Sequence, residues 1–194
     1  SFVDAMSNRI ELLRIGDARN PNTDIGPVVS EAQLKKNLEY LQIGLKDGAK
    51  QLTGGEQVEQ ATPGWYLSPA LFIDAKSEMK ICREEIFGPI AAVIPVNDYD
   101  EALNLANDSE FGLSAGIVTN DRLIIDHFID NIQSGMVQIN LPTAGMDFHA
   151  PITGRKNSSF GPPEKSSYCR EFFTNTKVVH ANYGKRLNSK KEES

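Results

Sequence analysis

Residues 90–140 decide the fold that the sequence predicts: IAAVIPVNDYDEALNLANDSEFGLSAGIVTNDRLIIDHFIDNIQSGMVQIN. Three short apolar runs, at 90–96, 112–120 and 134–140, alternate with two amphipathic segments of helical period. An unbroken apolar run of this length is typical of a strand that is buried on both faces of a parallel sheet. The order strand, helix, strand, helix, strand therefore predicts right-handed βαβ units.

Two further helices are predicted on the N-terminal side of this stretch. Apolar residues at helical spacing indicate a helix within residues 1–14. Ser30 followed three residues later by Gln33 is the signature of a capping box. The helix that it opens is expected to run to about Lys46 and to end near Gly48.

The C-terminal part of the chain has a different character. Residues 141–163 show no periodicity, and loops of that length in compact domains are usually functional or disordered. A short helical turn leads to the β-rich segment 172–180, and the polar residues 181–194 are expected to form a disordered tail. The predicted organisation is an α/β domain over 1–165, with a mostly parallel sheet flanked by helices, then a segment at 166–180 and the tail.

Composition and charge exclude several classes of protein. The net charge is −6 and the pI is about 5.1, which argues against a nucleic-acid surface. No run approaches the ~18 apolar residues of a membrane span, and no signal-peptide pattern opens the chain. Cys82 and Cys169 are expected to be free thiols of a cytoplasmic protein. Acidic neighbours would raise the pKa of Cys82, which favours inert thiols over nucleophiles.

Glu85 is the first candidate for ligand binding. It lies just before the predicted strand at 90–96, and an ionised carboxylate can accept hydrogen bonds from both hydroxyls of a ribose diol. Phe87, two residues further on, would form a wall of the same pocket. The alternative is a solvated acidic turn before Gly88, and acidic turns are common.

Three residues near the long loop are further candidates. Asn140 closes the last predicted strand, where an amide either points at a ligand or caps a turn. Phe148 and His149 lie inside the loop, where aromatic side chains indicate either binding or packing beneath the loop. The histidines and cysteines lack the spacing of metal ligands, and no Gly-rich phosphate loop occurs, so no metal site is predicted.

The motifs taken together resemble the C-terminal half of the NAD(P)-dependent aldehyde dehydrogenases. In chain order they are GDARNPNTDIGPVVSEAQ, TGG, YLSPALF, EEIFGPIAAV, ALNLANDSEFGLSAGIVTND, SGMVQIN, GRKNSSFG and FFTNTKVV. The resemblance runs from about residue 1 to residue 180, and EEIFGP and GLSAG in this order are its most specific parts. Two departures concern the region beneath the substrate loop, where PITG stands for the usual PFGG and GPPEKSS replaces the usual pattern.

The resemblance gives the candidate residues definite roles. It implies that Glu85 holds the nicotinamide ribose of NAD or NADP, with Phe87 beside the nicotinamide. It implies that Asn140 and the loop 141–151, with Phe148 and His149, border the mouth that admits a small aldehyde. The segment 172–180 resembles the family's oligomerisation strand, which implies a homo-oligomer. The loop sequence LPTAGMDFHAP is most similar to the subgroup that acts on α-ketoglutarate semialdehyde and related sugar-acid intermediates.

The same resemblance implies that this chain contains no catalytic residue. The family's nucleophilic Cys, its general-base Glu and its dinucleotide-binding fold would all lie upstream of Ser1. The parent enzyme would oxidise an aldehyde through attack by a thiolate, hydride transfer to the nicotinamide and hydrolysis to the acid. The chain by itself is expected to be inactive. Two alternatives stay open: a truncated, non-catalytic assembly protein, and a proteolytic fragment.

Overall fold

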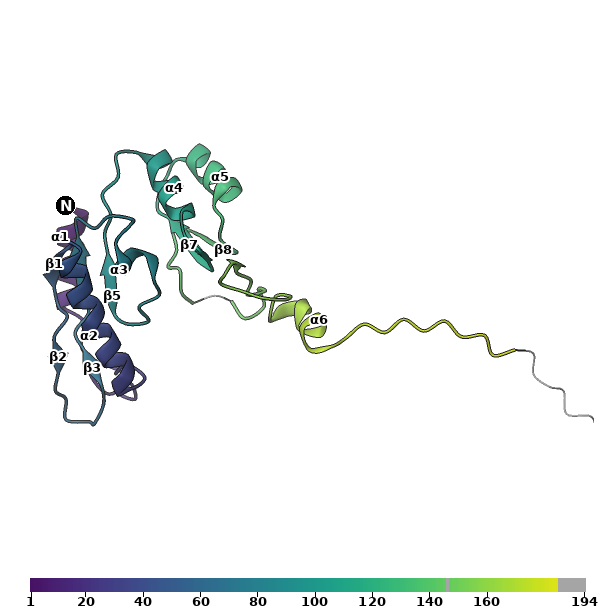
Figure 1. Ribbon diagram of the computed structural model, residues 1–194, viewed down its shortest axis with the longest axis horizontal. Coiled ribbons are helices and arrows are strands. Elements are labelled where there is room, and N and C mark those ends of the chain that lie inside the picture. Colours follow the sequence, from purple (N-terminus) through teal and green to yellow (C-terminus); the bar gives the residue numbers. More distant parts are fainter. Residues whose placement is uncertain (146, 185–194) are drawn as a thin grey trace, which may run out of the picture.

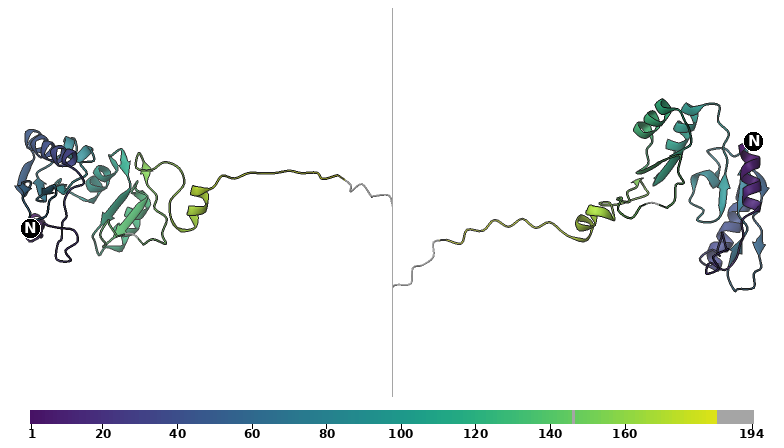
Figure 2. Two further views of the ribbon diagram at one scale, coloured as in Figure 1. Left: turned by 90° about the horizontal axis from the view of Figure 1, so that it is seen from below. Right: turned by 180° about the vertical axis from the view of Figure 1, so that it is seen from behind.

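The computed structural model describes residues 1–145 and 147–184, which form two lobes and an extended segment (Figures 1 and 2). The first lobe contains α1 (Phe2–Glu11), α2 (Glu31–Lys46), β1 (Lys50–Thr53), β2 (Gln57–Val58), β3 (Tyr66–Leu67), β4 (Ala70–Ile73), α3 (Lys80–Arg83) and β5 (Ile90–Ala92). The second lobe contains α4 (Tyr99–Asn107), β6 (Phe111–Gly112), β7 (Ser114–Ile117), α5 (Arg122–Asn131), β8 (Met136–Ile139) and β9 (Arg155–Lys156). The 3₁₀ turn η1 (Ser166–Tyr168) and α6 (Cys169–Phe173) follow.

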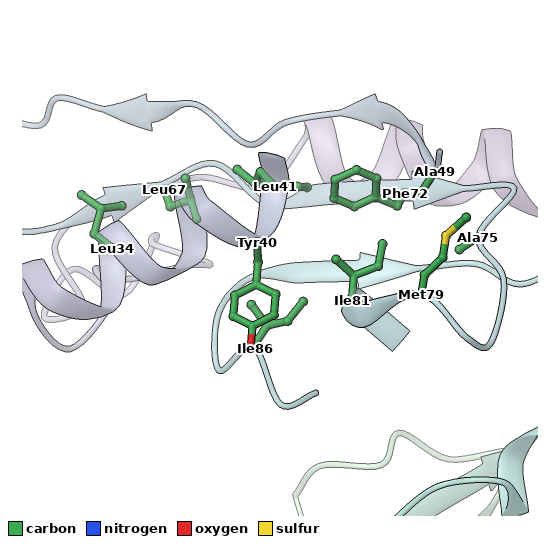
Figure 3. Close-up of a cluster of buried hydrophobic side chains, with 11 residues drawn as sticks. Leu34, Tyr40, Leu41, Ala49, Leu67, Phe72, Ala75, Met79, Ile81 and Ile86 are labelled. Atoms are coloured by element: carbon green, nitrogen blue, oxygen red, sulfur yellow. The ribbon is translucent and has the colours of Figure 1, made fainter. Parts of the chain in front are cut away.

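The first lobe is built by packing α2 against a three-stranded sheet of order β1-β4-β5. β1 pairs antiparallel with β4, and β4 pairs parallel with β5. Leu34 and Leu41 lie two turns apart on the buried face of α2, and Phe72 of β4 is completely buried in the same cluster (Figure 3). Burial of each such side chain contributes about 1.5–3 kcal/mol, so this cluster fixes α2 against the sheet.

Both ends of α2 follow the sequence prediction. The Ser30 hydroxyl accepts a hydrogen bond from the Gln33 backbone N–H at 3.2 Å, which confirms the N-cap. Gly48 follows the helix with φ of +98°, a conformation that glycine adopts without strain. The capping box is only half formed, because the Gln33 side chain donates to a distant loop instead of returning to Ser30.

The second lobe is centred on a parallel pair of strands. β7 and β8 pair from Ser114 with Met136 to Ile117 with Ile139, and α5 connects them. Asp121 caps α5 by accepting from two backbone N–H groups of its first turn. Phe128 and Ile132 pack with Leu103 of α4 in a second, smaller core. This part is the predicted βαβ unit.

The α/β class is confirmed, and the structure refines how its strands are arranged. In the described residues the strands form four small sheets, and parallel pairing is limited to β4–β5 and β7–β8. β5 and β7, predicted to be neighbours in one sheet, lie in different sheets. The prediction of burial on both faces for residues 90–96 is wrong, since the strand ends at Ala92 and Val96 is 42% exposed. Pro95 cannot donate to a ladder, and among the residues that the structure describes β5 pairs with β4 on one side and with no strand on the other.

The β-rich segment 172–180 begins later than predicted. Phe172 and Phe173 complete α6, and the extended stretch starts at Thr174, where β-branched residues become frequent. Within the described chain this stretch pairs with no strand and runs away from both lobes (Figures 1 and 2). The predicted tail lies mainly outside the described residues. Throughout residues 1–145 and 147–184, no helix has the length and apolar character to cross a bilayer.

Candidate cofactor and substrate site

Glu85 and Phe87 lie on the loop that joins α3 to β5. Ile86, between them, is 9% exposed and belongs to the core of the first lobe, whereas Glu85 is exposed and Phe87 is 69% exposed. The loop therefore buries its middle side chain and leaves the side chains on either side of it exposed, and Figure 3 shows Ile86 next to the Tyr40 ring of α2 in the same buried cluster.

The side chains of α2 hold the backbone of this loop. Gln33 Nε2 donates to the Ile86 carbonyl at 2.9 Å, and Lys36 Nζ donates to the Glu85 carbonyl at 3.3 Å. The Tyr40 hydroxyl donates to the Glu84 carboxylate. These hydrogen bonds involve the Glu85 backbone and the Glu84 carboxylate but not the Glu85 carboxylate, and Glu85 is exposed.

Phe87 has a left-handed backbone conformation, with φ of 58°. This region disfavours residues other than glycine, and a bulky aromatic there costs on the order of 1–3 kcal/mol. Such a conformation persists only where surrounding contacts impose it. The hydrogen bonds from α2 to Glu84, Glu85 and Ile86 fix the backbone that leads into this residue.

Glu85 borders a hollow between the two lobes. The hollow has a volume of about 360 Å³ and is lined by Cys82, Arg83, Glu84, Glu85, Phe111, Leu113, Asn157 and Ser158. Arg83 bridges the lobes at this position, since it forms an ion pair with Asp108 at 2.5 Å. The Arg83 guanidinium lowers the pKa of the Asp108 carboxyl, chiefly through this hydrogen bond. Glu85 thus lines a hollow of mixed polar and apolar character.

Cys82 lines the same hollow as a half-buried free thiol. Burial raises the pKa of Cys82, with Arg83 opposing the shift and Glu78 adding to it. The direction agrees with the sequence prediction, but burial is the main cause and the adjacent glutamates are not. A thiol that keeps its proton is a poor nucleophile.

Asn140 is directed at the protein itself. Its Oδ1 accepts from the Thr119 N–H at 2.9 Å, and its Nδ2 donates to the Thr119 carbonyl at 3.0 Å. Its backbone has φ of 55°, which asparagine tolerates better than most residues. Of the two interpretations of Asn140, turn capping is the one that these contacts support.

Phe148 and His149 lie together on the exposed loop after β8. Their ring centroids are 3.7 Å apart, and His149 Nδ1 is 3.0 Å from the Asp147 carboxylate. They line a hollow of about 670 Å³ together with Lys165, Ser166, Ser167 and Cys169. In the part of the chain that the structure describes, no group of three His, Cys, Asp or Glu is arranged to bind a metal ion.

The structure therefore separates the predicted residues into two places. Glu85 lines the hollow between the lobes, and Phe148 and His149 line a second one. Phe87, predicted to form a wall of the same pocket as Glu85, does not line that hollow. Sequence reasoning missed the residues of α2 beneath the loop 84–88. Asn37 was the available signal, because it interrupts the apolar face between Leu34 and Leu41.

Comparison with known proteins identifies the class to which this fold and site belong. Residues 1–179 match the aldehyde dehydrogenase family, and the chain belongs to that family. It is 41% identical over 180 residues to the α-ketoglutaric semialdehyde dehydrogenase of Bacillus subtilis, covering 92% of this chain and 37% of that protein. The α-ketoglutarate semialdehyde dehydrogenase of Haloferax volcanii is 39% identical over 187 residues, covering 94% of this chain and 38% of that protein.

Solved structures agree with this assignment. An aldehyde dehydrogenase of Bacillus cereus in complex with NAD⁺ matches with a TM-score of 0.85 and 32% identity, over 94% of this chain and 36% of that chain. An aldehyde dehydrogenase of Mycobacterium tuberculosis, also with NAD⁺, has a TM-score of 0.84 and 32% identity, over 95% and 38%. The chain thus spans less than two fifths of these relatives.

Proposed function

We propose that residues 1–165 form the C-terminal part of the catalytic domain of an NAD(P)-dependent aldehyde dehydrogenase. Family membership and the similarity to two NAD⁺-bound enzymes support this role. The observation that carries it is the loop 84–88, where Ile86 is buried while Glu85 and the left-handed Phe87 on either side of it are exposed. The nucleophile and the general base would come from outside this chain.

Glu85 and Phe87 fit the nicotinamide end of a dinucleotide. An exposed carboxylate can accept hydrogen bonds from both hydroxyls of a ribose, and an exposed aromatic ring offers a flat apolar face. The bound cofactor would supply hydride acceptance, and these residues would orient it. Residues that would distinguish NAD from NADP are expected elsewhere in such a fold.

The mouth for the aldehyde would be formed by the loop 141–151. Phe148 and His149 would line it, and Asn140 would shape it by holding the turn at Thr119. The relatives named for α-ketoglutarate semialdehyde favour a small aldehyde that carries a carboxylate. The two free cysteines fit a cytoplasmic location.

The extended segment after α6 supports a role in assembly. Phe173, Val178 and Val179 are 77%, 73% and 71% exposed, and the segment's backbone is unpaired within the described chain. Strand addition to the sheet of another subunit would cover both the backbone and these side chains. We therefore propose homo-oligomerisation through residues 172–180, a feature that a non-catalytic assembly protein would share.

The experiment compares the chain alone with a completed enzyme. The completed enzyme joins residues 1–180 to the N-terminal part of the Bacillus subtilis relative, and the readout is aldehyde-dependent NAD(P)H formation. We expect no activity from the chain alone and measurable activity from the completed enzyme. Glu85→Gln in the latter should raise the KM for the cofactor about 10-fold, because a charge-assisted hydrogen bond is lost. A folded, assembled but inactive completed enzyme would contradict the proposal.

A further inference from the structure

One polar residue lies completely buried beneath the loop 84–88. Asn37 is 0% exposed, on a helix face that also contains the buried Leu34, Tyr40, Leu41 and Gly44. A buried amide is costly unless it is hydrogen-bonded, and asparagine is a weak helix former. The contacts that Asn37 makes around the loop are therefore what give it a role.

The amide of Asn37 lies at the backbone of the loop. In one orientation its oxygen accepts from Gln33 Nε2 at 2.8 Å. In the other its nitrogen donates to the carbonyl oxygens of Ile86 at 3.2 Å and Gln33 at 3.3 Å. The second orientation also places this nitrogen 2.8 Å from Gln33 Nε2, which is itself a donor. In the first orientation Gln33 Nε2 donates both to the Asn37 oxygen and to the Ile86 carbonyl, so Asn37 holds the loop through the Gln33 amide.

Gly88 allows this close approach. A Cβ added to Gly88 would lie 2.2 Å from Asn37 Nδ2 and 2.5 Å from its Cγ. The backbone of Gly88 is not left-handed, so glycine is needed here for space and not for its φ angle. The loop therefore rests directly on the Asn37 amide.

Tyr40 holds the start of the same loop. It is 7% exposed, and its hydroxyl donates to Glu84, whose carboxylate also lies 3.7 Å from Lys80 Nζ. Asn37 and Tyr40 are almost one turn apart on α2, and between them they contact both sides of Glu85. Loss of either contact would free the loop residues that flank Phe87, whose backbone is left-handed.

We propose that Asn37 and Tyr40 are positioning residues that fix the loop 84–88, and thereby the direction of the Glu85 carboxylate and the Phe87 ring. The proposal rests on the cofactor role proposed for Glu85. Neither residue is required to touch the cofactor. Their effect would reach it through the backbone of Ile86 and Gly88 and through the carboxylate of Glu84.

The first test uses the 194-residue chain and a protease that cleaves after glutamate. Cleavage after Glu85 reports opening of the loop, and cleavage after Glu39 reports opening of α2. Asn37→Ala and Tyr40→Phe should each raise the rate after Glu85 about 10-fold, with the rate after Glu39 unchanged. Gln42→Ala, on the exposed face of α2, is the matched control and should change neither rate.

Two outcomes of this test are decisive. Unchanged cleavage after Glu85 in both variants would overturn the proposal. If Asn37→Ala accelerates cleavage at both sites, the helix α2 itself has opened. The result for Tyr40→Phe then decides whether the loop depends on α2, because this variant keeps the ring in the core and removes only the hydroxyl.

The second test measures cofactor affinity in the completed enzyme. Asn37→Ala should raise the KM for NAD(P) about 10-fold, with the KM for the aldehyde unchanged, because a small misplacement of a binding group is expensive. A purely structural role would reduce the active fraction and leave both KM values unchanged. Gly88→Ala should be deleterious alone, and Asn37→Ala should restore its stability by making room for the Cβ without restoring the KM.

Glu85→Gln separates the two proposals. If Glu85→Gln raises the cofactor KM and Asn37→Ala does not, the positioning role is wrong and the cofactor role stands. If Glu85→Gln has no effect, the cofactor role is wrong and the positioning role toward the cofactor falls with it. The protease test would still show whether the loop depends on α2.

Discussion

The loops 84–88 and 141–151 are both expected to face bound molecules, yet the chain supports them very differently. The first places Ile86 in the core and receives hydrogen bonds from α2. The second leaves Leu141 64% exposed and Phe148 69% exposed, and among its described residues His149 and Ala150 hydrogen-bond to Asp147 of the same loop. The contrast indicates that contacts within this chain hold the loop 84–88, whereas the exposed side chains of the loop 141–151 receive much less support from it.

The largest effect is expected from a change at Ile86, the buried residue that anchors the loop 84–88. Ile86→Ala should lower the free energy of unfolding of the first lobe by about 2–4 kcal/mol, because it removes buried methyl groups and leaves a cavity. Denaturant unfolding followed by the fluorescence of Trp65, which lies in the same lobe, measures this. Leu141→Ala is the matched control and should cost less than about 0.5 kcal/mol. Equal effects would show that the two loops are anchored alike.

An intermediate effect is expected at Asn140, where the second loop begins. Asn140→Gly should cost about 1 kcal/mol, because it removes both side-chain hydrogen bonds to Thr119. Asn140→Ala should cost about 1 kcal/mol more, because alanine is also strained at a positive φ. Thermal unfolding followed by circular dichroism would measure both. If the two variants were equally stable, the left-handed conformation would not be important.

The sequence predicted the elements of this fold better than their assembly. The capped start of α2, its end at Gly48 and the βαβ unit of the second lobe follow from local signals that act over a few residues. The division into separate sheets does not, because an apolar run predicts a strand but does not specify its neighbour. Residues 90–96 looked like a central strand, and the structure places β5 at the edge of its sheet.

Residues of the candidate site could be proposed where a motif marked them and not where tertiary contacts position them. Glu85 and Phe87 could be singled out from the sequence, but the left-handed backbone of Phe87 could not, because a bulky aromatic disfavours it. Gln33 illustrates the limit well. Its spacing from Ser30 predicted a capping box, yet its side chain contacts Ile86, 53 residues further along the chain. A local rule cannot anticipate a distant partner that competes for the same amide.

The smallest expected effect concerns the pH dependence of the Tyr40 contact. The hydrogen bond to Glu84, followed by burial, raises the pKa of Tyr40 above its ordinary value of 10.0. The folded state therefore keeps the phenol proton more tightly than the unfolded state does. The resulting stability is fully present below a pH of about 10, and is lost as the pH rises through the higher pKa of the folded state.

Tyr40→Phe isolates this contribution from the other groups that titrate in alkali. The difference in unfolding free energy between the wild-type chain and Tyr40→Phe should stay constant from about pH 7 to about pH 9 and shrink above about pH 10. Cleavage after Glu85 in the wild-type chain should accelerate over the same alkaline range, relative to Tyr40→Phe at each pH. A difference that persists unchanged at about pH 11 would mean that the phenol proton does not hold Glu84. In that case the packing of the Tyr40 ring on Ile86 would be its whole contribution to the loop.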